Sequence, residues 1–152
     1  MSRVGRHEDG GSAVVEFVWL TVVLLLPLVY LVVTLARVQA AAFAVDGASR
    51  AAARAVTSAP DEETGRRRAL DAVGLALRDQ GFDVDPAAVT RVTCAASGCL
   101  TPASRVGVEV VVDVGLPAVP AVLDRLGATV TVRSVHEGVV DAFRAAPVPR
   151  AS

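Results

Sequence analysis

Residues 17 to 36 read FVWLTVVLLLPLVYLVVTLA, a run of twenty residues without a charged side chain. A helix rises about 1.5 Å per residue, so this run spans about 30 Å, which is the thickness of the hydrocarbon core of a bilayer. A helix in a soluble protein usually keeps a polar face, and this run has none. The sequence therefore predicts one transmembrane helix over 17–36.

A cleaved signal peptide is the alternative to a permanent anchor. The apolar core of a signal peptide usually covers about 7–15 residues, which is shorter than this run. The small residues AAAFA at 40–44 would nevertheless offer a cleavage site, so this alternative stays open. The basic residues do not decide the orientation, because Arg3 and Arg6 precede the run and Arg37 follows it.

The composition excludes several classes of function. The chain has 152 residues, which suffice for one domain and an anchor, and its formal net charge of -1 gives no indication of direct nucleic-acid binding. The sequence contains neither a Gly-rich phosphate loop nor a cluster of metal ligands, and its histidines, His7 and His136, lie far apart. Asp83 and Asp85 form at best a weak cation site. We expect no catalytic residue, no metal, no cofactor and no enzymatic activity.

The membrane helix is expected to continue beyond the bilayer. Small and apolar residues recur at alternating spacings of four and three, a heptad-type seam made of Val38, Ala42, Val45, Ser49, Ala52 and Val56. We expect its C-terminal turns to pack under the protein's own sheet and the membrane part to make assembly contacts. Asp46 should pair with Arg50 one turn later. Pro27 removes one backbone hydrogen bond and predicts a kink in the membrane part.

The second half of the chain predicts an α+β domain. A second helix is expected over 61–80, with Ser58 as its capping residue and Gly81 as its stop. Strands are expected over 89–96, 106–114 and 129–140, and a short helix or loop crossing over 117–126. Together they predict a small antiparallel sheet of about three strands packed against the long helix. Residues 145–152 are expected to be disordered. The arginine run 66–68 is expected to be a solvated face, with a docking patch for acidic partners as the alternative.

Two cysteines, Cys94 and Cys99, enclose Ala-Ala-Ser-Gly. The spacing fits a disulfide at the end of a tight hairpin, and so short a loop contributes about 2 kcal/mol by the chain-entropy estimate. Free thiols are the alternative; zinc would need about four ligands. A disulfide requires an oxidising compartment, which places the C-terminal part outside the cytoplasm and the N-terminus inside it.

An acidic residue abuts the apolar run in the segment GGSAVVEF, residues 10–17. A carboxylate at the bilayer centre costs about 2.5–3.5 kcal/mol. If the chain were cut after Gly11, the new α-amino group of Ser12 in one subunit would pair with the Glu16 carboxylate of its neighbour. That pair would offset the cost of burial and fix the axial register between subunits. The alternative is a flexible linker that meets an ordinary anchor.

The same segment resembles the cleavage site of type IV prepilins. In that family a glycine precedes the scissile bond, a glutamate is the fifth mature residue and an aromatic residue follows it, and Gly11, Glu16 and Phe17 match those places. The resemblance implies a leader over 1–11 that a membrane-bound prepilin peptidase removes between Gly11 and Ser12. A serine after the cut leaves N-methylation open.

The rest of the chain narrows the resemblance to TadE-like minor pilins, or pseudopilins, of the tight-adherence (Tad, or Flp) pilus. The match rests on the GSxxxEF start, on the Ala/Arg-rich continuation DGASRAAARAV from Asp46, and on TVRSVHEGVVDAFR at 131–144. It implies a long helix over 12–57, an extracytoplasmic pilin-like domain over 58–144, and a single-pass location in the cell membrane, with the domain at the cell surface after assembly. The implied partners are the prepilin peptidase, other pilin subunits and the inner-membrane assembly platform. The alternative function is an unprocessed, anchored binding module of the cell envelope.

Overall fold

The computed structural model describes residues 10–95, 98–115 and 129–144, without the side chains of 10–12. The chain divides into two compact units, 1–36 and 37–152, and each is described by itself. The expected crossing over 117–126 and the expected disordered tail over 145–152 lie outside the described residues. Within them the protein is a mixed α+β structure with a long N-terminal helix, a second long helix and a three-stranded antiparallel sheet, which confirms the predicted fold class.

Helix α1 covers Gly10–Thr57 and is the one helix, among the described residues, that is long and apolar enough to cross a membrane. In the first unit its large apolar side chains are exposed on every side, as expected for a helix whose solvent is lipid. The hydroxyl of Thr21 donates to the carbonyl of Phe17 at 2.8 Å, so this polar group is satisfied within the helix. The helix continues through Pro27, and the kink there stays a prediction.

The part of α1 in the second unit carries a buried stripe that differs from the predicted seam. Ala42 is exposed and Val38 is half-buried, so the heptad pattern is wrong at its start. Spacings of three and one alternate along the stripe, which is the wide face of a helix in a globular core rather than a narrow coiled-coil seam. Its members are Ala41, Ala44, Val45, Ala48, Ser49, Ala52, Ala53 and Val56. These C-terminal turns pack in the protein's own core, as expected.

Helix α2 covers Glu62–Asp79, and its capping residue is Asp61 rather than the predicted Ser58. The Asp61 carboxylate accepts a hydrogen bond from the Thr64 backbone N–H at 2.8 Å. The Ser58 hydroxyl instead donates to the Arg54 carbonyl at 2.7 Å, so it belongs to the end of α1. A carboxylate also suits the positive end of the helix dipole better than a hydroxyl does.

The predicted stop at Gly81 is present, with a φ of 77° that favours glycine. The Gly81 N–H donates to the Arg78 carbonyl and the Phe82 N–H to the Leu77 carbonyl, both at 2.9 Å. These two bonds form a Schellman motif, and its usual apolar contact is supplied by Phe82 and Leu77, which are both buried. The Arg37 guanidinium lies 5.4 Å from the centre of the Phe82 ring.

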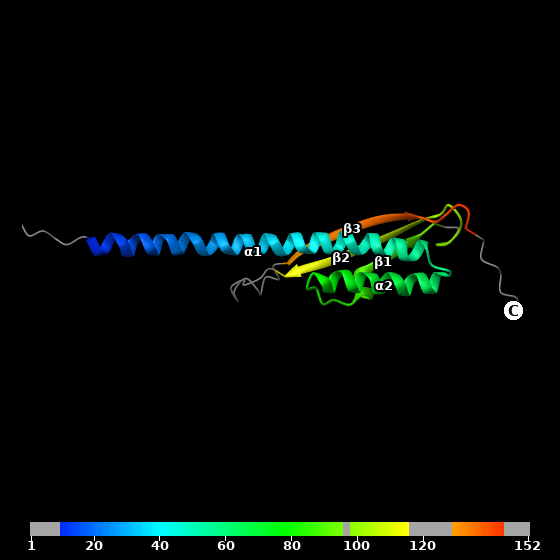
Figure 1. The fold of residues 1–152 in the computed structure, drawn as a ribbon, viewed down its shortest axis with the longest axis horizontal. Helices are drawn as coiled ribbons and strands as arrows, with labels where there is room; N and C mark the ends of the chain where they lie inside the picture. The colour runs from blue at the N-terminus through cyan, green and yellow to red at the C-terminus, as the bar shows by residue number, and fades with distance from the viewer. Residues whose placement is uncertain (1–9, 96–97, 116–128, 145–152) are drawn as a thin grey trace, which may run out of the picture. The chain divides into compact units, whose positions relative to one another are not determined.

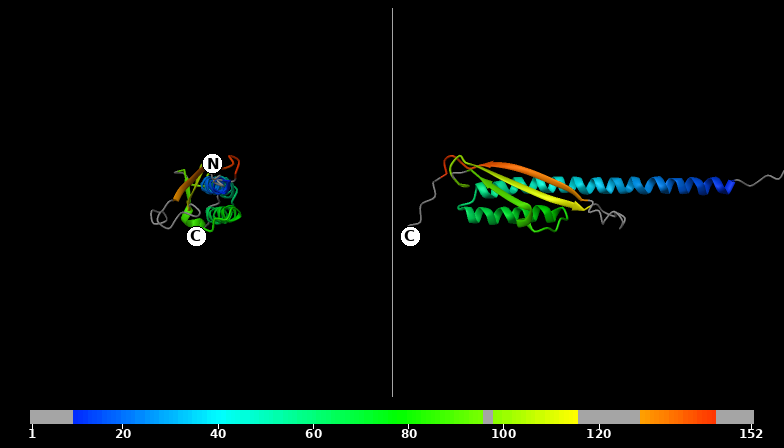
Figure 2. Two further views of the ribbon diagram at one scale, coloured as in Figure 1. Left: turned by 90° about the vertical axis from the view of Figure 1, so that its left-hand side faces the viewer. Right: turned by 180° about the vertical axis from the view of Figure 1, so that it is seen from behind.

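The sheet has the order β1-β2-β3 and is antiparallel throughout, with β1 at Thr90–Cys94, β2 at Arg105–Gly115 and β3 at Thr129–Val139. A four-residue helix, α3 (Pro86–Val89), precedes β1. Among the described elements, α1 and α2 lie on one side of the strands (Figures 1 and 2), and we call the opposite side of the sheet its open face. Burial alternates along β2, where five valines are 0–2% exposed: Val106, Val108, Val110, Val112 and Val114.

Gly138 in β3 allows the sheet to approach α1 closely. A Cβ at this position would lie 2.9 Å from Thr57 Cγ2 and 3.4 Å from the Ala53 carbonyl oxygen. The alanines of the buried stripe serve the same purpose on the helix side, because a small side chain lets the backbone of α1 come close to the sheet. The absence of a side chain at Gly138 therefore lets β3 pack directly against Ala53 and Thr57 of α1.

Candidate functional site

The predicted cleavage and register residues all lie on the first turns of α1. Gly11 and Ser12 are helical, and Glu16 and Phe17 follow with exposed side chains. Between residues 13 and 36 Glu16 is the one charged residue. A shallow apolar hollow of about 290 Å³ lies on the same turns, lined by Val14, Val15, Val18, Trp19 and Val22, and Glu16 is not among its lining residues. The first turns of α1 thus carry a single carboxylate on an otherwise apolar helix surface that is suited to lipid or to another apolar helix.

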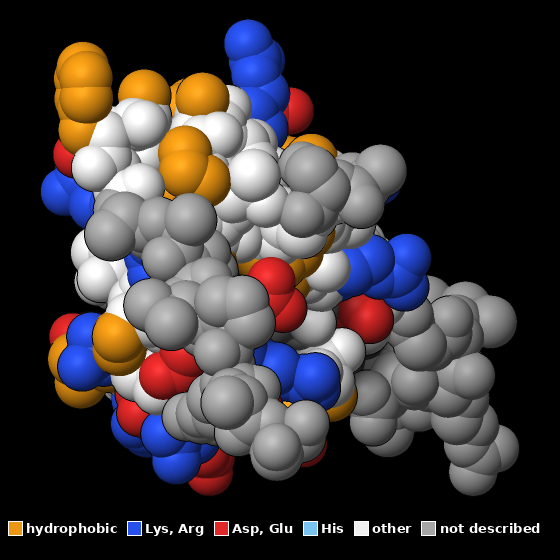
Figure 3. Space-filling model, turned by 90° about the vertical axis from the view of Figure 1, so that its right-hand side faces the viewer, with side chains coloured by type: hydrophobic (Ala, Val, Ile, Leu, Met, Phe, Trp, Pro, Cys, Tyr) orange, Lys and Arg blue, Asp and Glu red, His pale blue; other side chains and the backbone are white. Residues whose placement is uncertain are grey.

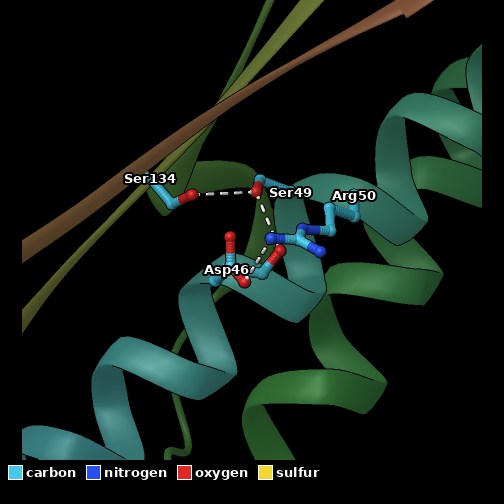
Figure 4. A network of polar contacts seen from close by, with 4 residues as sticks. All are labelled: Asp46, Ser49, Arg50 and Ser134. Atoms are coloured by element: carbon cyan, nitrogen blue, oxygen red, sulfur yellow. Dashed lines mark hydrogen bonds and ion pairs between the residues drawn. The ribbon is translucent and has the colours of Figure 1, made fainter.

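The junction between α1 and β3 is fixed by a polar contact inside the core (Figure 4). Ser49 Oγ lies 3.1 Å from Ser134 Oγ and also donates to the Asp46 carbonyl at 3.0 Å. The Asp46 carboxylate accepts from Arg50 at 3.0 Å, which is the predicted i,i+4 pair. Both partners of that pair are about half exposed, so it contributes a few tenths of a kcal/mol.

The C-terminal end of α1 is held by a residue that the sequence did not single out. Arg144 donates to the carbonyls of Thr57, Ala59 and Pro60, at 3.2, 2.5 and 2.9 Å. The last carbonyls of a helix have no partner within it, so a guanidinium there satisfies the acceptors and complements the negative end of the dipole. The sequence around Arg144 contains no local pattern that predicts a contact with the end of α1.

Cys94 and Cys99 form the predicted disulfide, with their Cα atoms 4.7 Å apart. The bridge closes the connection between β1 and β2. Glu62 Oε1 accepts from the Cys99 N–H at 3.0 Å, and the Ser104 hydroxyl donates to the Cys99 carbonyl at 3.1 Å. The connection is thereby tied to the first turn of α2, a contact that the spacing of the cysteines could not predict.

The open face of the sheet carries paired charges. Arg133 Nε lies 2.5 Å from the Glu109 carboxylate, and an Arg105–Glu137 pair spans 3.5 Å. At the end of the molecule seen in Figure 3, acidic and basic side chains likewise lie next to one another. The arginines of both pairs are exposed, and pairs of this kind contribute little stability.

The weaker sequence candidates are placed as follows. His136 is half-buried on the helix side of β3, because the even-numbered residues of β3 face α1. Glu137 is exposed on the other face, where it pairs with Arg105. Asp85 caps α3 by accepting from the Ala87 N–H, and Asp83 is exposed. Within the described ranges no three His, Cys, Asp or Glu residues are grouped so that they could hold a metal.

Comparison with known proteins gives no relative, because no family model, curated protein or solved structure matches the chain. The functional argument therefore rests on the residues of α1 and on the domain built around its second half.

Proposed function

We propose that this protein is a minor pilin or pseudopilin of a tight-adherence (Flp-type) pilus, cut by a prepilin peptidase between Gly11 and Ser12. The observation that carries the proposal is the position of Glu16, a lone carboxylate on an apolar helix, five residues after a glycine. Cleavage would make Ser12 the first residue and would move the free α-amino group to within one turn of the carboxylate.

The physical reason for such a carboxylate is subunit register. An unpaired carboxylate in the bilayer is costly, by about 2.5–3.5 kcal/mol at its centre. The α-amino group of a neighbouring subunit would remove that cost only at one axial offset between the two helices. The exposed apolar side chains on the same turns, Val14, Val15, Val18, Trp19 and Val22, give the neighbouring helix a surface to pack against. Incorrect offsets would leave both charges unpaired.

The second half of α1 supports the proposal in a different way. Its alanine stripe is the core of the extracytoplasmic domain, so the domain travels with the helix when the helix is extracted from the membrane. The Arg144 contacts and the disulfide stiffen the far end of this unit. The partners would be the peptidase, other pilin subunits and the inner-membrane platform, and the domain would face outward.

The register role is tested by exchanging Glu16→Ala in the native host. Processing should persist, because the cleavage site is intact, while the amount of the protein in sheared surface fractions should fall about tenfold or more. Glu63→Ala is the matched control, since it removes an exposed carboxylate from α2 and should change neither readout. Normal incorporation of the Glu16→Ala protein would refute the register role.

A further inference from the structure

The free edge of β3 lacks the features that usually protect an edge strand. β3 has 11 residues, lies at one edge of the sheet that the described residues form, and contains neither proline nor lysine. Its register with β2 runs without a bulge. Shortness, proline, lysine and bulges are the common means by which proteins prevent such an edge from pairing with another chain. The edge of β3 is therefore suited to receive a further strand.

The two edges of the sheet carry opposite charges on the open face. At one edge, Glu137 of β3 is exposed and pairs with Arg105. At the other edge, Arg91 of β1 lies directly opposite Glu109 of β2, so the two side chains share the open face. Arg91 is exposed and forms no ion pair with the residues that the structure describes.

The register shows which backbone groups are directed outward at each edge. The Val140 N–H donates to the Ser104 carbonyl, so the even-numbered residues of β3 bond to β2 and the odd-numbered ones face the free edge. The odd-numbered residues of β2 then bond to β1, which leaves Thr90 and Val92 of β1 directed to its own free edge. Each edge thus offers both N–H and carbonyl groups.

The direction of the strands decides which edges can meet. β1 and β3 run in the same direction, because both are antiparallel to β2. Copies that cross one membrane in the same sense carry their domains in the same orientation. A sideways repetition of the domain therefore brings the β3 edge of one copy beside the β1 edge of the next, as a parallel pair. An antiparallel pair of two β3 edges would require that one copy be reversed.

We propose that β3 of one copy pairs with β1 of a second copy, with Glu137 opposite Arg91. In a parallel pair a residue bonds to the two residues that flank its neighbour on the other strand. The Glu137 N–H donates to the Thr90 carbonyl, and the Val92 N–H donates to the Glu137 carbonyl. The Glu137 carboxylate then lies on the open face between two guanidiniums, that of Arg105 in its own copy and that of Arg91 in the next.

The charges also select the register. A shift by four residues places Arg133 opposite Arg91, and like charges that lie opposite each other are destabilising. Shifts by two residues leave Arg91 opposite Val135 or Val139, without a charged partner. The contact joins two different surfaces, so it does not close at two copies but continues as a row. It requires only that copies share a membrane, so it does not rest on the pilin assignment.

Cross-linking in membranes tests which edges meet. Two differently tagged full-length chains, Glu137→Cys and Arg91→Cys, are co-expressed without a prepilin peptidase, and the membranes are oxidised mildly. Residues opposite each other on neighbouring strands lie within reach of a disulfide. The mixed dimer should exceed about fivefold the one formed by Asp113→Cys with Arg91→Cys, because Asp113 is exposed on the central strand. A yield no higher than this control, or equal linking of two Glu137→Cys chains, would overturn the proposal.

Charge reversal tests the register. Copies labelled with two different dyes are reconstituted in vesicles of neutral lipid at a fixed ratio of protein to lipid, and energy transfer between copies is measured. Arg91→Glu or Glu137→Arg alone should reduce the fraction of copies in contact about threefold or more, because attraction becomes repulsion. The double variant should restore contact to within about twofold of the unmodified chain. A double variant no better than either single one would contradict the pairing of Glu137 with Arg91.

Discussion

The two halves of α1 belong to one continuous helix but are built for different surroundings. Over 13–36 the side chains are mostly Val and Leu, and they are exposed in the protein itself. Over 37–57 the apolar residues are mostly alanines, and those on one face are fully buried under the sheet and α2. The large side chains thus form a surface suited to lipid, and the small ones pack against protein.

The difference shows how side-chain size sets the partner of a helix. Alanine lets a backbone approach another backbone closely, as at Gly138 against Ala53 and Thr57. Valine and leucine cover the helix with apolar surface and prevent its backbone from meeting water, which suits a bilayer. A membrane half and a core half can therefore be told apart by residue volume, even where both are apolar.

The largest expected effect comes from placing a charge on the buried stripe. Ala48 is 0% exposed, so Ala48→Asp buries an unpaired carboxylate and should cost about 3–5 kcal/mol of domain stability. Ala42→Asp is the matched control on the exposed face and should cost less than about 0.5 kcal/mol. Thermal unfolding in micelles measures both. If Ala42→Asp cost more stability than Ala48→Asp, the predicted heptad seam would be right and the observed stripe wrong.

The second effect separates the membrane half from the domain. Leu25→Arg puts a charge near the middle of the apolar run and should cost about 2.5–3.5 kcal/mol of insertion free energy, with less protein resisting carbonate extraction. The unfolding temperature of the domain should stay unchanged, since this side chain lies outside the core. Leu25→Val serves as the control. A domain that lost stability together with insertion would contradict the division into two halves.

The smallest effect concerns the contact between Gly138 of β3 and Thr57 of α1. Gly138→Ala places a Cβ 2.9 Å from Thr57 Cγ2 and should cost about 1–3 kcal/mol. Thr57→Ser removes that methyl group, so the double variant should recover much of the loss. A double-mutant cycle on unfolding free energies measures the coupling. Additive losses would mean that the strand accommodates the Cβ in another way.

The elements that alternate or repeat regularly could be predicted from the sequence, and contacts between distant residues could not. The strands, the stop at Gly81 and the disulfide rest on local patterns that a single stretch contains. The heptad seam failed at Ala42 because a spacing of four and three fits both a narrow seam and a wider face, and only the position of the sheet decides between them. The prediction of Ser58 as the cap was wrong because its hydroxyl donates to the Arg54 carbonyl at the end of α1, and Asp61 caps α2 instead. The Arg144 contacts join residues far apart in the chain, so no local pattern reveals them.

The pilin assignment is tested most directly by the mature N-terminus. The full-length chain is expressed with the prepilin peptidase of its own genome, purified from membranes and measured by intact-mass spectrometry. The account predicts a chain that begins at Ser12 and that keeps residues 1–11 when the peptidase is omitted. A chain that still begins at Met1 or Ser2 in the presence of the peptidase would contradict the account and favour an unprocessed anchored module, and a start after the alanines at 40–44 would identify a secreted protein.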